Sequence, residues 1–309
     1  MQNFHFFQNL KPHLKTKTMR VLITGSNGQL GSEIKELTPD YKNLECIFVD
    51  QSQLDICDAE ALNSFILDNH INSVINCAAY TSVDQAEENP KIAEQINEKV
   101  VLYLVNALEK VGGKLVHIST DYVFDGNHSC PYKESDPVSP ISVYGKTKRA
   151  GELVVLNSSI DAIVIRTSWL YSTYSNNFVK LMLRLGNEKE SLKVVFDQRG
   201  TPTYARDLAK ICLDILSDKN SVNLSKKRCL YHYSNEGDTS WYDFATTIMK
   251  ISNIDCKVIP IETKDYPTEA KRPMYSVLDK SKIKSDFKIK IPHWKDSLAY
   301  CIKKINQNS

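Results

Sequence analysis

The sequence predicts an α/β fold with a doubly wound parallel sheet and a smaller C-terminal lobe. Short apolar runs, typical of buried strands, alternate with segments of helical periodicity from residue 19 to about residue 170. This alternation favours a parallel sheet covered by helices on both faces. In addition, the first of these strands runs directly into a glycine-rich turn that opens a helix.

The strands of the first half are expected at the apolar runs 20–24, 45–50, 73–79, 114–120 and 162–167. Between them, helices are expected after the glycine-rich turn to about residue 37, and at 58–69, 90–111, from 144 onward and 177–185. Asp58 stands where it can cap the second of these helices.

The alternation weakens after about residue 170. Strands are expected at 192–196 and 231–234, and helices at 205–216, 241–251 and 295–305, with prolines marking the loops. We therefore expect residues 171–309 to form mainly a substrate-binding lobe. Chain order alone leaves open whether some of these elements return to the main sheet.

The composition is that of a folded protein with a balanced charge. Of the 309 residues, 42% are hydrophobic, and the formal net charge is +2. A charge this small indicates neither a nucleic-acid partner nor an acidic membrane, and no apolar run reaches transmembrane length.

None of the eight cysteines forms a Cys-x-x-Cys pair, so we expect reduced thiols in a cytoplasmic protein. Residues 1–18 are basic and lack acids, and they are predicted to be a disordered or wrongly started leader.

The glycine-rich turn has the spacing Gly25-x-x-Gly28-x-x-Gly31. Glycines at these positions allow a tight turn, the approach of a pyrophosphate and close helix–strand packing, and the helix N-terminus attracts phosphates. Asp50 follows at the end of the second strand, where an acid can accept hydrogen bonds from the adenine ribose. Residues 19–170 are therefore predicted to be a Rossmann-type dinucleotide-binding domain that also carries the catalytic residues.

Asp50 also bears on the choice of cofactor. Its carboxylate would repel a 2′-phosphate, and no arginine follows it directly, so we expect NADH to be preferred over NADPH. The alternative is that Asp50 only caps a turn or a helix.

A tyrosine and a lysine are the candidate catalytic residues. Tyr144 and Lys148 are four residues apart on an expected helix, which places them on one face, and Thr120 ends the buried strand 114–120. A free tyrosine has a pKa of about 10, and a nearby ammonium would lower it. Lys148 could also hold the nicotinamide ribose, and Thr120 could bind the substrate oxygen. Tyr-x-x-x-Lys alone is common on surface helices, but in this context it predicts a nicotinamide-dependent carbonyl reductase.

Several motifs together resemble the extended short-chain dehydrogenase/reductase superfamily. They are Thr24-Gly25-x-x-Gly28-x-x-Gly31, Asn76-x-Ala78-Ala79, Ser119-Thr120 and Tyr144-x-x-x-Lys148. Longer motifs resemble the dTDP-4-dehydrorhamnose reductases, and the resemblance extends from about Met19 to the C-terminal helix. These motifs span 78–87, 119–126, 144–152, 166–171, 197–203 and 272–273.

The resemblance implies reduction of the 4-keto group of dTDP-4-dehydro-L-rhamnose by NADH or NADPH, which gives dTDP-L-rhamnose for cell-surface polysaccharide such as O-antigen. Tyr144 would protonate the alkoxide, Lys148 would tune Tyr144 and bind the ribose, and Thr120 would orient the ketone. Thr120, Asp121 and Trp169 would contact the substrate, although Trp169 could instead be a packing aromatic. The resemblance also allows a homodimer and Mg²⁺, without identifying metal ligands. The cofactor would be lined by Gly28, Gln29, Leu30, Asp50, Asp55, Ile56, Ala79, Tyr80 and Thr81.

Residue Tyr122 argues against one alternative function, and others stay open. A sugar-nucleotide 4,6-dehydratase of the same superfamily would carry Asp-Glu after the threonine, whereas Asp121 is followed here by Tyr122. A 4-epimerase, or another sugar-nucleotide reductase, would share the fold. A regulatory subunit resembling the β subunit of methionine adenosyltransferase would bind a partner without catalysis, which the intact Thr120, Tyr144 and Lys148 argue against.

Overall fold

The computed structural model describes residues 18–217 and 228–308. The leader expected at residues 1–18 therefore lies outside the described residues, apart from Thr18.

The main body is a six-stranded parallel sheet with the strand order β10-β5-β4-β3-β1-β2. The predicted fold class, a doubly wound α/β sheet, is confirmed. One strand comes from the second half of the chain, because β10 pairs with β5 at the edge. The strands are β1 (Met19–Thr24), β2 (Leu44–Phe48), β3 (Ser73–Asn76), β4 (Lys114–Thr120), β5 (Asp161–Thr167) and β10 (Arg228–His232).

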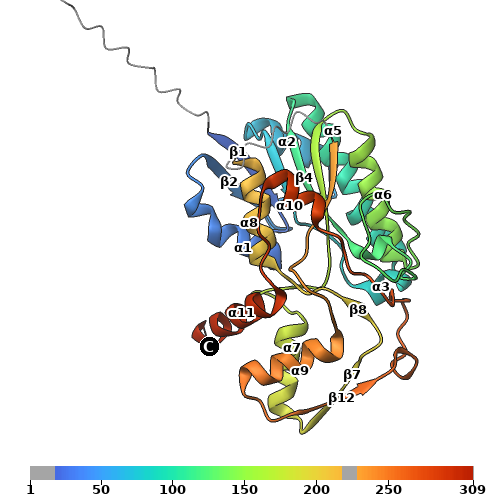
Figure 1. Cartoon of the computed structure of the whole chain (residues 1–309). Helices are drawn as coiled ribbons and strands as arrows, with labels where there is room; N and C mark the ends of the chain where they lie inside the picture. Colours follow the sequence, from blue (N-terminus) through green and yellow to red (C-terminus); the bar gives the residue numbers. More distant parts are fainter. Residues whose placement is uncertain (1–17, 218–227, 309) are drawn as a thin grey trace, which may run out of the picture.

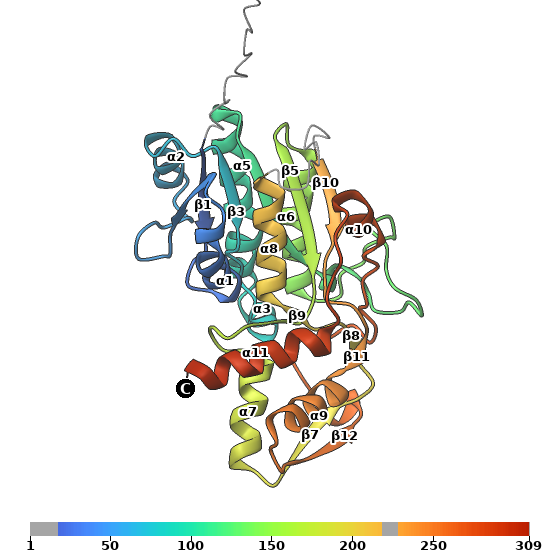
Figure 2. The same cartoon turned by 60° about the vertical axis from the view of Figure 1, so that its left-hand side comes forward.

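Helices cover both faces of this sheet (Figures 1 and 2). Successive side chains of a strand point to opposite faces, so Val21 and Ile23 pack under one layer and Leu22 under the other. Both faces are therefore buried, as the apolar runs in the strands predicted. The first layer holds α1 (Gln29–Leu37), α8 (Ala205–Leu216) and α10 (Ser281–Phe287), and the second holds α2 (Ala59–Asp68), α5 (Val100–Val111) and α6 (Val143–Asn157).

The chain reverses its winding direction at β1. It passes from β1 to its neighbour β2 and then crosses back to β3, which pairs with the other side of β1. Connections leave in opposite directions at such a point, which opens a crevice beyond the carboxyl ends of the strands. The N-terminus of α1 lies at this crevice.

A smaller lobe lies below the sheet in Figure 1. It contains α7 (Phe178–Glu188), α9 (Trp241–Ser252) and a parallel pair made of β7 (Ser191–Val195) and β12 (Lys257–Ile261). The lobe has its own apolar core, separate from the two cores of the sheet. Helix α11 (Trp294–Asn308) lies between the sheet and the lobe in Figure 2. Two short pairs complete the lobe: β6 (Leu170–Tyr171) with β9 (Thr203–Tyr204), and β8 (Arg199–Gly200) with β11 (Thr239–Ser240).

Two expected elements differ in a way that matters for the crevice. The strand expected at 73–79 ends at Asn76, because the next residues leave the sheet to pack against Gly25. The helix expected at 90–111 is divided into α4 (Pro90–Glu94), a π-helical turn at Gln95–Lys99, and α5. Apolar periodicity does not reveal a π turn, which inserts one residue without ending the helix. The short helix α3 (Val83–Glu88) was not predicted.

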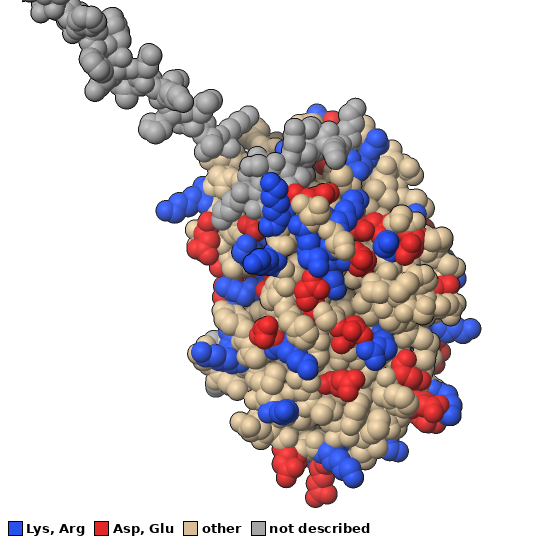
Figure 3. Space-filling model, viewed as in Figure 1, with Lys and Arg blue, Asp and Glu red and all other residues tan. Residues whose placement is uncertain are grey.

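Acidic and basic side chains are interspersed on the face shown in Figure 3. Within residues 18–217 and 228–308, no helix has both the length and the apolarity needed to cross a membrane.

Candidate functional site

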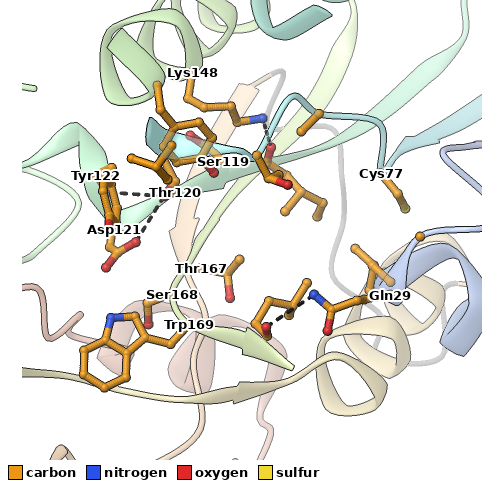
Figure 4. A pocket seen from close by; sticks show the side chains of 18 of the residues that line it. Gln29, Cys77, Ser119, Thr120, Asp121, Tyr122, Lys148, Thr167, Ser168 and Trp169 are labelled. Atoms are coloured by element: carbon orange, nitrogen blue, oxygen red, sulfur yellow. Dashed lines mark hydrogen bonds between the residues drawn. The ribbon is translucent and has the colours of Figure 1, made fainter. Parts of the chain in front are cut away.

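Two adjoining cavities follow the carboxyl edge of the sheet. The larger has a volume of about 480 Å³ and the smaller about 310 Å³. Gly28, Cys77 and Ala79 line both, so the two form one continuous cleft. Figure 4 shows the larger cavity, with Lys148 and Thr120 on one side, Trp169 on the other, and Gln29 and Cys77 at the end nearest the smaller cavity.

The glycine-rich turn is closely packed and could hold a phosphate group. Gly25 has a φ of +61°, and a Cβ there would lie 2.8 Å from the backbone nitrogen of Ala78. A Cβ on Gly31 would lie 2.5 Å from the Gly25 carbonyl oxygen, so only glycine lets α1 approach the loop this closely. Gly28 is the N-cap of α1 and has no side chain with which to cap it, and the first turn of α1 contains no acid. Its first N–H groups are thus available for an anion. Gln29 and Leu30 of this turn line the larger cavity.

Asp50, Asp55 and Ile56 line the smaller cavity together with Gly25 and Gly28. The Asp50 carboxylate accepts hydrogen bonds from the Ser52 backbone nitrogen at 2.8 Å and hydroxyl at 2.6 Å, and from the Asn27 side-chain amide. These donors, chiefly Ser52, lower the pKa of Asp50, so the carboxylate is ionised at neutral pH. The structure thus brings the predicted acid to the same cavity as the glycine-rich turn.

The loop after β3 forms the edge between the cavities. Ala79 and Thr81 line the cleft, whereas Tyr80 lines neither cavity. The backbone nitrogen and oxygen of Tyr80 instead pair with the Asn97 side chain, at 2.9 and 3.2 Å. Asn97 lies in the π-helical turn and also donates to the Thr147 hydroxyl on α6 at 3.1 Å. Sequence reasoning missed Asn97, because only the tertiary structure shows that it joins this loop to the helix of Tyr144.

Thr120, Tyr144 and Lys148 line the same cavity. Helix α6 begins at Val143, with Ser142 accepting a hydrogen bond from the Gly145 nitrogen at 3.1 Å, so Tyr144 stands in the first turn. The Lys148 ammonium donates to the Ile118 carbonyl oxygen at 2.6 Å. The Thr120 hydroxyl accepts a hydrogen bond from the Tyr122 nitrogen at 3.2 Å. The predicted constellation is therefore assembled at the end of β4.

The electrostatics of this trio differ from the expectation. Burial raises the pKa of Tyr144 to about 12, with a contribution from the Asp121 carboxylate, and a hydrogen bond with Thr120 partly opposes the shift. Burial also lowers the pKa of Lys148 to about 8, while Glu152 acts in the opposite direction. Lys148 was expected to lower the pKa of Tyr144, but its ammonium is directed to the Ile118 carbonyl. The protein's own groups thus keep Tyr144 protonated at neutral pH, as a proton donor requires.

A buried ionic network connects the elements that carry this trio. The fully buried Glu152 carboxylate accepts two hydrogen bonds from Arg166, at 2.7 and 2.8 Å, and one from the Ser119 hydroxyl at 2.6 Å. Arg149 adds a further bond at 2.7 Å. A buried carboxylate is stable when it is paired and hydrogen-bonded in this way. The network joins β4 and β5 to α6 and so fixes Thr120 relative to Tyr144.

The far end of the larger cavity is lined by Asp121, Tyr122 and Trp169. Asp121 is 2% exposed, and burial raises its pKa to about 6, with hydrogen bonds from Ser276 and Thr120 acting against the shift. Trp169 has a φ of +47°, which is uncommon for a residue with a bulky side chain. The three residues expected to contact a substrate, Thr120, Asp121 and Trp169, therefore share one cavity.

The sequence matches the model of the family described as the RmlD substrate binding domain, over residues 19–307. The chain belongs to this family. A dTDP-4-dehydrorhamnose reductase of Aggregatibacter actinomycetemcomitans is 43% identical over 286 residues, which are 90% of this chain and 97% of the relative. The family expected from the motifs is therefore confirmed.

Solved structures of the RmlD family agree with the fold. A dTDP-4-dehydrorhamnose reductase of Clostridium acetobutylicum has a TM-score of 0.87 at 43% identity, covering 93% of this chain and 100% of the other. The enzyme of the same name from Bacillus anthracis, solved in complex with NADP, has a TM-score of 0.86 at 37% identity, covering 93% and 99%. Both relatives are oxidoreductases by name, in line with the predicted enzyme class.

Several residues that line the larger cavity in this RmlD family member were missed by sequence reasoning. Some of them lie inside the motifs 119–126 and 166–171, so the sequence could have indicated that they line the site: Ser119, Tyr122, Ser168 and Leu170. Trp241 begins α9 in the lobe and reaches the cavity only through tertiary packing, so no local pattern identifies it. The full set not assigned beforehand is Cys77, Val83, Ile118, Ser119, Tyr122, Thr167, Ser168, Leu170, Ser175, Asn176 and Trp241.

The Mg²⁺ ion allowed by the family resemblance stays a prediction. Across the described ranges, no group of three or more His, Cys, Asp or Glu side chains is arranged to hold a metal ion.

Proposed function

We propose that the protein reduces the 4-keto group of dTDP-4-dehydro-L-rhamnose to the alcohol of dTDP-L-rhamnose, with NADH or NADPH as the reductant. One observation carries the proposal: Thr120, Tyr144 and Lys148 line a cavity that continues into the glycine-rich turn. Membership of the RmlD family and the names of the relatives support the same substrate.

The protein's groups supply binding and a proton. A bound nicotinamide supplies the hydride that adds to C4. Thr120 would hold the ketone oxygen, and Tyr144 would give its phenolic proton to that oxygen as the new C–H bond forms. Lys148, which is mostly cationic at neutral pH, would offset the negative charge left on Tyr144 and bind the ribose.

The glycine-rich turn and Asp50 would hold the cofactor, and we propose that NADH is preferred. The ionised Asp50 carboxylate lines the smaller cavity, where it would accept hydrogen bonds from ribose hydroxyls and repel a 2′-phosphate. The Bacillus anthracis relative was solved with NADP, so the choice deserves a direct measurement. We expect kcat/KM to be higher with NADH than with NADPH. Asp50→Ala should reduce the ratio of these two kcat/KM values. A clearly higher kcat/KM with NADPH would contradict this role of Asp50.

A coupled assay tests the reaction itself. dTDP-4-dehydro-L-rhamnose should cause loss of NADH or NADPH absorbance with the wild-type protein. Tyr144→Phe should lose roughly 10²-fold or more in kcat, the range typical of general acids, while the dissociation constant for NADH stays within about threefold. Tyr103→Phe on α5, which packs in the core on the opposite side of the sheet from α1 and α8, is the matched control and should keep full activity.

The outcome also separates the alternatives. An epimerase would convert the sugar without net loss of NADH, and a regulatory subunit would bind nucleotide without reducing any ketone. Near-full activity of Tyr144→Phe would remove the proposed proton donor.

All eight cysteines are free thiols, which supports our placing the reaction in the reducing cytoplasm. A homodimer also stays a proposal, which sedimentation of the purified protein would test.

A further inference from the structure

Two tryptophans form a stacked pair at the wall of the larger cavity. The ring centroids of Trp169 and Trp241 are 3.7 Å apart and the ring planes differ by 10°. Both side chains are partly buried, and both line the cavity. The Phe178 ring packs against Trp241, with 4.6 Å between the ring centroids, and joins the pair to the core of the lobe.

Three separate segments fix this pair. Trp169 follows β5 with a φ of +47°, and its carbonyl oxygen accepts a hydrogen bond from the Thr203 nitrogen at 3.1 Å. Gly200 in β8 lies directly against the Trp169 ring, because a Cβ there would lie 2.6 to 2.8 Å from three of its atoms. β8 pairs with β11, and β11 leads straight into Trp241 at the start of α9. The Trp169 ring is therefore held between two elements of the lobe, Gly200 in β8 and Trp241 at the start of α9.

The position of the pair indicates which part of the substrate it would contact. Thr167 is the residue of β5 that pairs with Thr120 of β4, and Trp169 follows only two residues later. Figure 4 shows the Trp169 ring below Asp121, on the side of the cavity opposite Lys148. A ketone held by Thr120 would thus place the sugar, rather than the base beyond two phosphates, beside the indoles. A 6-deoxy sugar carries an apolar methyl group on the carbon next to C4.

We propose that Trp241 is a positioning residue for the sugar: its indole fixes the Trp169 ring, and the two indoles form the apolar wall against which the 6-deoxy edge of the sugar packs. The proposal rests on the proposed function. Aromatic rings bury large apolar areas, and stacked pairs add a geometric preference to that burial, so loss of one ring of the pair should weaken recognition by the other.

Kinetics separate this role from simple packing of the lobe. Trp241→Ala should raise the KM for dTDP-4-dehydro-L-rhamnose about tenfold, the order expected for loss of one aromatic pair, with less than about a threefold change in kcat and in the NADH dissociation constant. Trp241→Phe should restore most of the affinity. In a Trp169→Ala background, Trp241→Ala should add little further increase, because Trp241 acts through Trp169. Trp294→Phe replaces the third tryptophan, which is buried in the lobe core and does not line the cavity, and should leave KM unchanged.

A spectroscopic readout reports the pair independently of turnover. The chain has three tryptophans, so in Trp294→Phe only the stacked pair remains, and its exciton couplet in circular dichroism should disappear on Trp241→Phe. The product dTDP-L-rhamnose, titrated into Trp294→Phe, should change that couplet. An unchanged KM in Trp241→Ala, or an equal effect of Trp294→Phe, would overturn the inference while leaving the reductase function intact. Absence of any NADH or NADPH oxidation by the wild type would instead overturn the proposed function, and this inference with it.

Discussion

At the scale of single residues, the role proposed for Lys148 predicts that the reaction depends on pH. Burial lowers its pKa to about 8, so the ammonium loses its proton as the pH rises through that value. We expect kcat/KM to fall with a slope of one proton above about pH 8, because a neutral lysine no longer offsets the charge on Tyr144. A profile from pH 6 to 10 measures this, with Lys146→Met as the control, because Lys146 is exposed on the same helix. A rate constant that stays flat to pH 9.5 would remove the cationic Lys148 from the mechanism.

Asp121 is a second residue whose ionised form is unfavourable, because its carboxylate is buried in the folded protein. The fold raises its pKa from 3.8 to about 6, mainly through burial, and among the described residues its Oδ2 atom has no hydrogen-bond partner. The folded state therefore favours the neutral acid, and this contribution to stability is complete below pH 4 and is lost as the pH rises through 6. Asp121→Asn should accordingly raise the free energy of unfolding at pH 8 by at most about 3 kcal/mol, at 1.36 kcal/mol per pKa unit, and change it little at pH 4.

Urea unfolding at both pH values tests this stability change. Asp125→Asn is the matched control, because hydrogen bonds from Asn127 hold the pKa of Asp125 below its ordinary value, so its replacement should not stabilise the protein at pH 8. Equal stability changes for Asp121→Asn at pH 4 and pH 8 would contradict the assignment to charge burial. A gain in stability with a loss of activity would show that the acid is kept for the substrate.

At the scale of elements, helix α1 packs so closely against the glycine-rich turn that we expect any side chain at position 31 to disturb this contact. A Cβ on Gly31 would lie 2.5 Å from the Gly25 oxygen and 2.6 Å from the Ser26 Cα. Both are backbone atoms, so Gly31→Ala must displace the helix from the loop. We expect a loss of about 1–3 kcal/mol in unfolding free energy and at least a tenfold weaker NADH affinity by calorimetry. Ser32→Ala on the same helix is the control, and an unchanged affinity in Gly31→Ala would show that the loop adjusts freely.

The same elements show what sequence reasoning can reach. β4 and α8 agree with their expected bounds at both ends, because each is defined by a long apolar pattern with clear turn residues beside it. The π-helical turn that holds Asn97 escaped detection, since it leaves the apolar pattern of a helix intact. In the site, local motifs located Tyr144 and Lys148, whereas Trp241 depends on lobe packing that no local pattern encodes.

At the scale of the whole molecule, the segment after β12 closes the lobe against the main body. A Cβ on Gly126, in the loop that follows β4, would lie 2.6 Å from the Pro273 Cα. The Arg199 nitrogen, in β8, donates to the Met274 oxygen at 2.8 Å. Arg272 forms two hydrogen bonds with Asp84 at the start of α3, at 2.6 and 3.1 Å. This segment thus contacts both the main body, at the loop after β4 and at α3, and the lobe, at β8.

We therefore expect the Arg272–Asp84 pair to govern substrate binding more than stability. The two side chains are 23% and 42% exposed, and pairs this exposed contribute about 0–1 kcal/mol to folding. Arg272→Met should raise the KM for the sugar nucleotide several-fold, because the segment beside the cavity loses its anchor on α3, and should speed hydrogen exchange in residues 262–280. Arg184→Met, which breaks the more exposed Arg184–Glu188 pair on α7, should change neither quantity. If Arg272→Met instead lowered the free energy of unfolding by 3 kcal/mol or more and left KM unchanged, the pair would serve folding rather than closure of the site.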